Sequence, residues 1–137
     1  MSTFKFAFNE REYELNTEKL DYFLNDEEQP LVVETEDILT LMNEADEVVF
    51  EQQYYDEPCG VCLNGKKEKT KYFKFLEYHF FIFAKEQKFV VSSISKDRDM
   101  SFNRMEKQGL VDGSYIVSIM VCENCGSYAI EIEQCEV

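Results

Sequence analysis

The chain has 137 residues and a mass of 16.2 kDa, with 45% hydrophobic residues and a formal net charge of −14. This apolar content excludes intrinsic disorder, and the length fits a single domain, residues 1–137, that buries roughly two-thirds of its unfolded surface. There is no 18-residue apolar span and no basic start followed by an apolar stretch. We therefore expect neither a membrane helix nor a signal peptide, and a cytoplasmic location.

The negative charge is confined to the first half of the sequence. Residues 1–57 contain 17 Asp and Glu against 3 Lys and Arg, a balance of −14, whereas residues 58–137 contain 11 of each. A region with this much negative charge repels a phosphate backbone, so nucleic-acid binding is disfavoured. The acidic half is either a solvated surface, or a face that docks a basic partner or mimics nucleic acid toward a protein.

The first fifteen residues show the alternation of an antiparallel hairpin. Residues 3–8 place three phenylalanines on one face, and residues 11–15 alternate apolar with acidic side chains. This period of two predicts two strands joined by a two-residue turn.

Two helices and a strand are expected next. Asn16 or Thr17 caps the first helix, in which apolar residues 20, 23 and 24 follow at helical spacing. Thr35 caps the second, whose apolar residues 38, 41, 42 and 45 form one stripe of a helix. Residues 48–55 then predict a strand that leads to the first pair of cysteines.

Cys59 and Cys62 form this first pair and follow Pro58. Zinc-dependent nucleobase deaminases share the Pro-Cys-x-x-Cys pattern, but they need a His-x-Glu upstream, and the one histidine, His79, lies downstream. A thioredoxin-like pair begins a helix that lowers the pKa of its first thiol, whereas residues 63–65 predict a turn. Thiol redox chemistry at Cys59 and Cys62 remains an alternative.

The middle of the chain predicts a long central strand. Five lysines within residues 66–74 indicate an exposed loop or strand edge. Seven of the thirteen residues 72–84 are aromatic. Apolar side chains occupy both odd- and even-numbered positions, which favours a strand buried on both faces. Residues 85–88 would turn this strand back into residues 89–94. His79 is expected to be a packed or edge residue rather than a catalyst or ligand.

A third helix is expected at about residues 99–108, with Phe102 and Met105 inward and Gly109 as its C-terminal cap. Cys135, the fifth cysteine, is expected on the same face of the last strand as two acidic residues, Glu131 and Glu133. It is therefore expected to be a free thiol near the surface.

The second pair of cysteines, Cys122 and Cys125, lies between an apolar run at residues 115–121 and an alternating run at 127–134. Two thiolates from one tight turn can bind one ion at ~2.3 Å from each sulfur, and Gly126 can take the positive φ that the turn requires. This stretch resembles the knuckle of zinc-ribbon proteins.

The resemblance implies a tetrahedral structural zinc held by Cys59, Cys62, Cys122 and Cys125, one ion per chain. Compact ribbons separate their two pairs by roughly 15–20 residues. Here 59 residues separate Cys62 from Cys122, which a shared ion tolerates because closure entropy grows only with the logarithm of loop length.

Together these observations predict an α+β fold: a mostly antiparallel sheet of hairpins with two or three short helices, stapled by a four-cysteine zinc site within residues 58–137. An all-cysteine site is closed to substrate, which disfavours an enzyme. As a whole, the chain resembles an uncharacterised family of short bacterial proteins of unknown function, which implies no activity. We expect a protein-interaction or regulatory module. The alternatives are a redox or metal-dependent enzyme that uses Cys59 and Cys62, with Cys135 as an auxiliary thiol, and an acidic nucleic-acid mimic.

Overall fold

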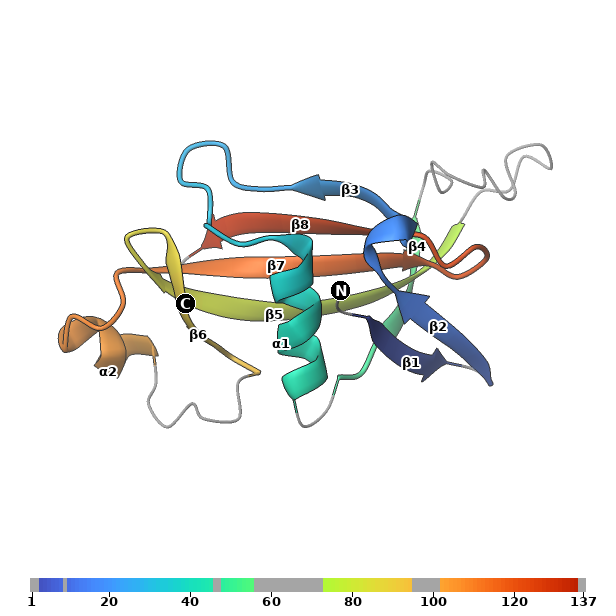
Figure 1. The fold of residues 1–137 in the computed structure, drawn as a ribbon, viewed down its shortest axis with the longest axis horizontal. Helices are drawn as coiled ribbons and strands as arrows, with labels where there is room; N and C mark the ends of the chain where they lie inside the picture. The colour runs from blue at the N-terminus through green and yellow to red at the C-terminus, as the bar shows by residue number, and fades with distance from the viewer. Residues whose placement is uncertain (1–2, 9, 46–47, 56–72, 95–101, 136–137) are drawn as a thin grey trace.

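The computed structural model describes residues 3–8, 10–45, 48–55, 73–94 and 102–135. A six-stranded sheet dominates it, with strand order β3-β8-β7-β5-β4 and with β6 paired to the far end of β5 (Figure 1). The strands are β3 (Leu20–Leu24), β4 (Glu51–Tyr55), β5 (Phe73–Lys85), β6 (Lys88–Ser92), β7 (Gly113–Cys122) and β8 (Tyr128–Cys135).

The centre of the sheet is the antiparallel pair β5 and β7. Their register runs over ten residue pairs, from Phe75 opposite Cys122 to Ala84 opposite Gly113. The long aromatic strand expected at residues 72–84 is confirmed as β5. Both of its faces contribute to the interior: Leu76, Phe80 and Ile82 belong to the main hydrophobic cluster, and Phe83 belongs to a second cluster on the opposite face.

One face of the sheet is covered by helix α1 (Thr35–Glu44) and by the separate hairpin of β1 (Phe4–Phe8) and β2 (Arg11–Leu15) (Figure 1). The helix buries its apolar stripe in the main cluster, which also contains these side chains of both β-layers: Phe4, Tyr13, Leu15, Leu76, Phe80, Val117, Ile119, Ile130 and Ile132. The helix predicted at this place is confirmed. Its N-cap is Glu34 rather than Thr35, and the Glu34 N–H donates to the Asp37 carboxylate at 2.8 Å.

The helix α2 (Phe102–Lys107) packs on the opposite face at one end of the sheet, where Met105 and Val111 contact Phe83. Gly109 ends it with a φ of 74°, and the Leu110 N–H donates to the Met105 carbonyl at 3.0 Å. A positive φ at this position is the left-handed cap that the sequence predicted.

The first predicted helix is wrong. Asn16 caps only the single 3₁₀ turn η1 (Thr17–Lys19), by accepting the Lys19 N–H at 3.1 Å. The residues that follow form β3, which pairs in parallel with β8 and leaves Leu20 and Phe23 packed against the core. Apolar spacing favoured a helix here, but hydrogen bonds along the open edge of β8 stabilise an extended segment better than a helix of two turns stabilises itself.

The expected fold class must therefore be corrected. The protein is mostly β with a mixed sheet, not an α+β fold with a mostly antiparallel sheet, because β3 replaces a helix and adds a parallel pair. The zinc staple that formed part of that expectation is not shown either. Cys59 and Cys62 lie outside the described residues, and the contact between the layers that the structure shows is a buried hydrophobic cluster.

The two faces of β7 predict unequal losses of stability. Ile119 is fully buried in the main cluster, whereas Ile116 faces the opposite side of the sheet and is partly exposed. Replacing Ile119 by alanine should lower the free energy of unfolding by about 2–5 kcal/mol, the sum of lost transfer energy and a cavity. The control Ile116→Ala should cost less, as measured by urea unfolding. Equal losses would contradict the assignment of the two faces.

Candidate metal centre

The turn between β7 and β8, which carries Cys122 and Cys125, is held by backbone hydrogen bonds. The Gly126 N–H donates to the Cys122 carbonyl at 2.9 Å, and the Cys122 N–H donates to the Ser127 carbonyl at 2.8 Å. Gly126 has a φ of 80°, which L side chains rarely adopt. The predicted positive φ is confirmed, and the turn is closed at both ends by backbone hydrogen bonds.

This turn carries two thiols in different surroundings. Cys122 ends β7 and is buried, with 4% of its surface exposed, whereas Cys125 is partly exposed in the turn. The Cys125 sulfur lies 2.9 Å from the Ser127 hydroxyl. The second predicted pair of metal ligands is therefore brought together in one turn, one thiol on the sheet and one at its tip.

The hairpin of the acidic half holds this turn from the side. The Arg11 guanidinium donates to the carbonyl oxygens of Glu123 and Asn124, at 2.5 and 2.8 Å, so it binds both residues between the two cysteines. The Tyr13 hydroxyl donates to the Glu123 carbonyl at 3.0 Å. Lys19 is also close, since a Cβ placed on Gly126 would lie 3.6 Å from the Lys19 ammonium nitrogen.

Burial raises the pKa of Tyr13, and the neighbouring Glu123 and Cys122 act in the same direction, while Arg11 opposes them. The phenol therefore stays protonated well above neutral pH and keeps its hydrogen bond to the turn. Arg11 also lies over the Tyr13 ring, with 4.9 Å between its guanidinium carbon and the ring centroid. Sequence reasoning missed these contacts, because Arg11 and Glu123 are 112 positions apart.

The first pair of predicted ligands, Cys59 and Cys62, lies outside the described residues. The strands on either side of them end beside the turn: Tyr55 closes β4 opposite Phe73, and Phe75 lies opposite Cys122. Gln52 of β4 also donates to the Glu123 carboxylate at 2.7 Å. Within the described ranges, no group of three or more His, Cys, Asp or Glu side chains is arranged to hold a metal ion.

The remaining thiol, Cys135, is a free cysteine that is partly buried at the end of β8. Burial raises the pKa of this thiol, against a smaller lowering by its hydrogen bond with the Ser114 side chain. A raised pKa keeps the thiol protonated at neutral pH, which disfavours a role as a nucleophile.

His79 lies on the face of β5 opposite the main cluster, with 46% of its side chain exposed. Its Nδ1 is 2.8 Å from the Ser118 hydroxyl of β7, and its Nε2 is 3.5 Å from the Glu77 carboxylate, which also accepts a hydrogen bond from Tyr55. Ser, His and Glu thus lie in a row. β7 lies between β5 and β8, so its backbone amides around Ser118 are engaged in the ladders and cannot form an oxyanion hole. This row therefore gives no support to nucleophilic catalysis.

The fold and this turn define a mostly β protein in which a clamped pair of cysteines closes the last hairpin. A family model described as "Protein of unknown function (DUF3785)" matches residues 4–137, and the chain belongs to this family. No curated protein and no solved structure matches the chain. None of the helices in the described part has the length and apolar character needed to cross a membrane.

The contacts of Arg11 predict that its side chain stabilises the turn. Replacing Arg11 by glutamine removes the positive charge and the forked donor, and should lower the free energy of unfolding by roughly 1–2 kcal/mol, because the hydrogen bonds are charge-assisted but exposed. Lys5→Gln removes an exposed charge from the neighbouring strand β1 and should change stability by less than about 0.5 kcal/mol. Urea unfolding of both variants measures the difference, and equal effects would refute a specific clamp.

Alanine substitutions at Gly126 and Gly109 test whether the backbone conformation of the turn protects Cys122. Both have a positive φ, and an added Cβ meets nothing closer than 3.6 Å at either position, so alanine should cost roughly 1–2 kcal/mol of backbone strain at each. Only Gly126→Ala should also increase the rate at which iodoacetamide labels Cys122, as followed by mass spectrometry. Unchanged labelling in Gly126→Ala would show that the turn does not depend on this glycine.

Proposed function

We propose that the protein binds one structural zinc ion through Cys59, Cys62, Cys122 and Cys125, and that it acts as a binding module for another protein rather than as an enzyme. The observation that carries this proposal is the closed turn at Cys122 and Cys125, with its left-handed glycine. Thiolates are the ligands that zinc prefers in structural sites, and two of them within one tight turn are half of a tetrahedral set.

The described strands support a contribution from the first pair of cysteines. Tyr55 of β4 lies opposite Phe73 of β5, and Cys122 of β7 lies opposite Phe75, two residues further along β5. Two strand spacings and two residues give a separation of about 12 Å between Tyr55 and Cys122. Cys59 follows Tyr55 by four residues, which span at most about 14 Å when extended. The length of the intervening chain therefore allows Cys59 to reach an ion held by Cys122 and Cys125.

Electrostatics also favours a thiolate-bound metal at this turn. Zn²⁺ with four thiolates carries a formal charge of −2, which must be compensated where the site is partly buried. Arg11 and Lys19, two of the three cations in residues 1–57, both lie at this turn. Hydrogen bonds to the backbone of the two intervening residues would also hold the ligands in place when the metal binds.

A non-catalytic role follows from the donor set. Four thiolates leave no coordination position for water or substrate. The main hydrophobic cluster draws side chains from the acidic half and from the second half alike, so we infer that residues 1–137 act as one unit. A cytoplasmic setting, where thiols remain reduced, is part of the proposal.

Metal content tests the proposal directly. Protein purified without a metal-affinity tag should contain one zinc per chain by elemental analysis, and native mass spectrometry should show the matching mass increase. Cys125→Ser removes a partly exposed ligand and should release most of the zinc, while Cys135→Ser, a control at another partly buried thiol, should keep it. Folding of both variants is checked by circular dichroism. A metal-free protein with a disulfide within either pair, or with a rapidly alkylated Cys59, would refute the zinc site and favour redox chemistry.

A further inference from the structure

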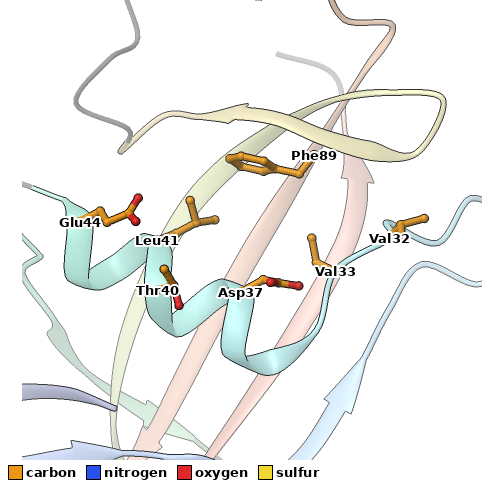
Figure 2. A pocket seen from close by; sticks show the side chains of 7 residues that line it. All are labelled: Val32, Val33, Asp37, Thr40, Leu41, Glu44 and Phe89. Atoms are coloured by element: carbon orange, nitrogen blue, oxygen red, sulfur yellow. The ribbon is translucent and has the colours of Figure 1, made fainter. Parts of the chain in front are cut away.

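A groove runs between helix α1 and strand β6, at the opposite end of β5 from the cysteine turn (Figure 2). It has a volume of about 470 Å³. Its lining consists of four apolar and three polar side chains: Val32, Val33, Leu41, Phe89, Asp37, Thr40 and Glu44. Leu41 of the helix and Phe89 of the strand point into the space from opposite sides (Figure 2).

The groove is open rather than enclosed. Phe89 keeps 39% of its surface exposed and Val32 keeps 64%. Sites for small molecules typically bury most of their ligand, so these exposures fit an occupant that covers the surface from outside, as a polypeptide segment does.

The charges along the groove select the chemistry of that occupant. Asp37, Leu41 and Glu44 occupy positions i, i+4 and i+7 of α1, so they share one face, and the two carboxylates lie roughly 10 Å apart along the axis on either side of the leucine. The helix contains no basic residue. In the part of the chain that the structure describes, no Lys or Arg forms an ion pair with either carboxylate. On the strand side, Lys88 lies opposite Val32.

Glu44 stands in the last turn of α1, where the helix dipole favours a cation and where the helix has none. A positive charge supplied by a partner would relieve this unfavourable placement. The Asp37 carboxylate accepts the Glu34 N–H, but neither it nor Glu44 forms an ion pair with a Lys or Arg of the described residues. An apolar strip flanked by two such carboxylates is complementary to an apolar side chain flanked by lysine or arginine.

We propose that the groove between α1 and β6 docks a basic amphipathic segment of another protein, with an apolar side chain between Leu41 and Phe89 and cationic side chains at Asp37 and Glu44. This inference rests on the proposed role as a binding module and identifies its surface, but it does not depend on the zinc site.

Binding of a model segment tests the proposal. The probe is a fluorescein-labelled synthetic helix of about 18 residues with leucines on one face and lysines on the other. A scrambled peptide of the same composition lacks the apolar stripe. Fluorescence anisotropy should show saturable binding of the first peptide, weaker binding of the scrambled one, and a fall in affinity when salt rises from roughly 50 to 300 mM.

Matched variants separate the groove from general attraction to an acidic protein. Phe89→Ala should weaken binding about tenfold, as expected for a central aromatic anchor. Its control Tyr54→Ala removes an exposed aromatic from β4, which pairs with the opposite end of β5, and should leave binding unchanged. Glu44→Gln should weaken binding about threefold, whereas Glu12→Gln, which removes an equally exposed charge from β2, should not.

Three outcomes would overturn the proposal. Equal affinities for all four variants would show non-specific attraction to the acidic surface. Displacement of the peptide by octylamine at matching concentrations would identify a site for small organic cations. Sedimentation velocity that shows a dimer of the protein alone, lost in Phe89→Ala, would assign the groove to a second copy of this chain. The zinc content of each protein is measured in parallel: failure of the unaltered protein to bind the peptide while it retains zinc would overturn the groove proposal alone, and weakened binding by Phe89→Ala counts for the groove only if that variant retains its zinc.

Discussion

The ten-residue antiparallel ladder between β5 and β7 is the constraint on which the other features depend. Its register fixes both ends of the sheet at once. At one end Phe75 lies opposite Cys122, so the cysteine turn begins where β4 and β5 meet. At the other end Ala84 lies opposite Gly113, and β5 turns back into β6, which forms one wall of the groove. A shift of one residue in this ladder would move every buried side chain of β7 to the other face of the sheet.

The acidic half of the chain contributes differently to these two ends. Its few cations are concentrated where the second half offers backbone carbonyls: Arg11 and Lys19 lie at the cysteine turn. Its carboxylates on α1 face outward beside Leu41 and Phe89. Two cations of the acidic half therefore lie at the cysteine turn and two of its carboxylates line the groove, at opposite ends of the central strands.

The sequence predicted those elements whose pattern is local. The period of two identified β1, β2 and β8, a continuous apolar run identified β7, the density of aromatic residues identified β5, and the spacing of apolar residues identified α1. The left-handed conformations of Gly126 and Gly109 were also predictable, because few other residues tolerate that backbone. In each case the information needed lies within about fifteen residues of the element.

What the sequence could not supply is pairing between distant segments. Residues 20–24 have apolar spacing compatible with a helix, and only the open edge of β8, more than a hundred positions away, makes them the strand β3. The change from α+β to a mostly β, mixed sheet follows from that one pairing. The contact of Arg11 with the cysteine turn was not predicted for the same reason, because a single arginine in an alternating strand does not indicate its partner.

Strand β3 and the Arg11 contacts were not predicted for a common physical reason: both depend on contacts between residues far apart in the sequence. The N-terminal strands contact β8 and the turn before it. These contacts join residues that are more than a hundred positions apart in the sequence. Such contacts carry a large entropic cost of closure and form only after a scaffold exists. The local hairpins β5–β6 and β7–β8 can form that scaffold, and the long β5–β7 ladder then aligns them. The N-terminal layer would dock last, and it would bring the cations of the acidic half to the cysteines only when the strands that carry those cysteines are already in place.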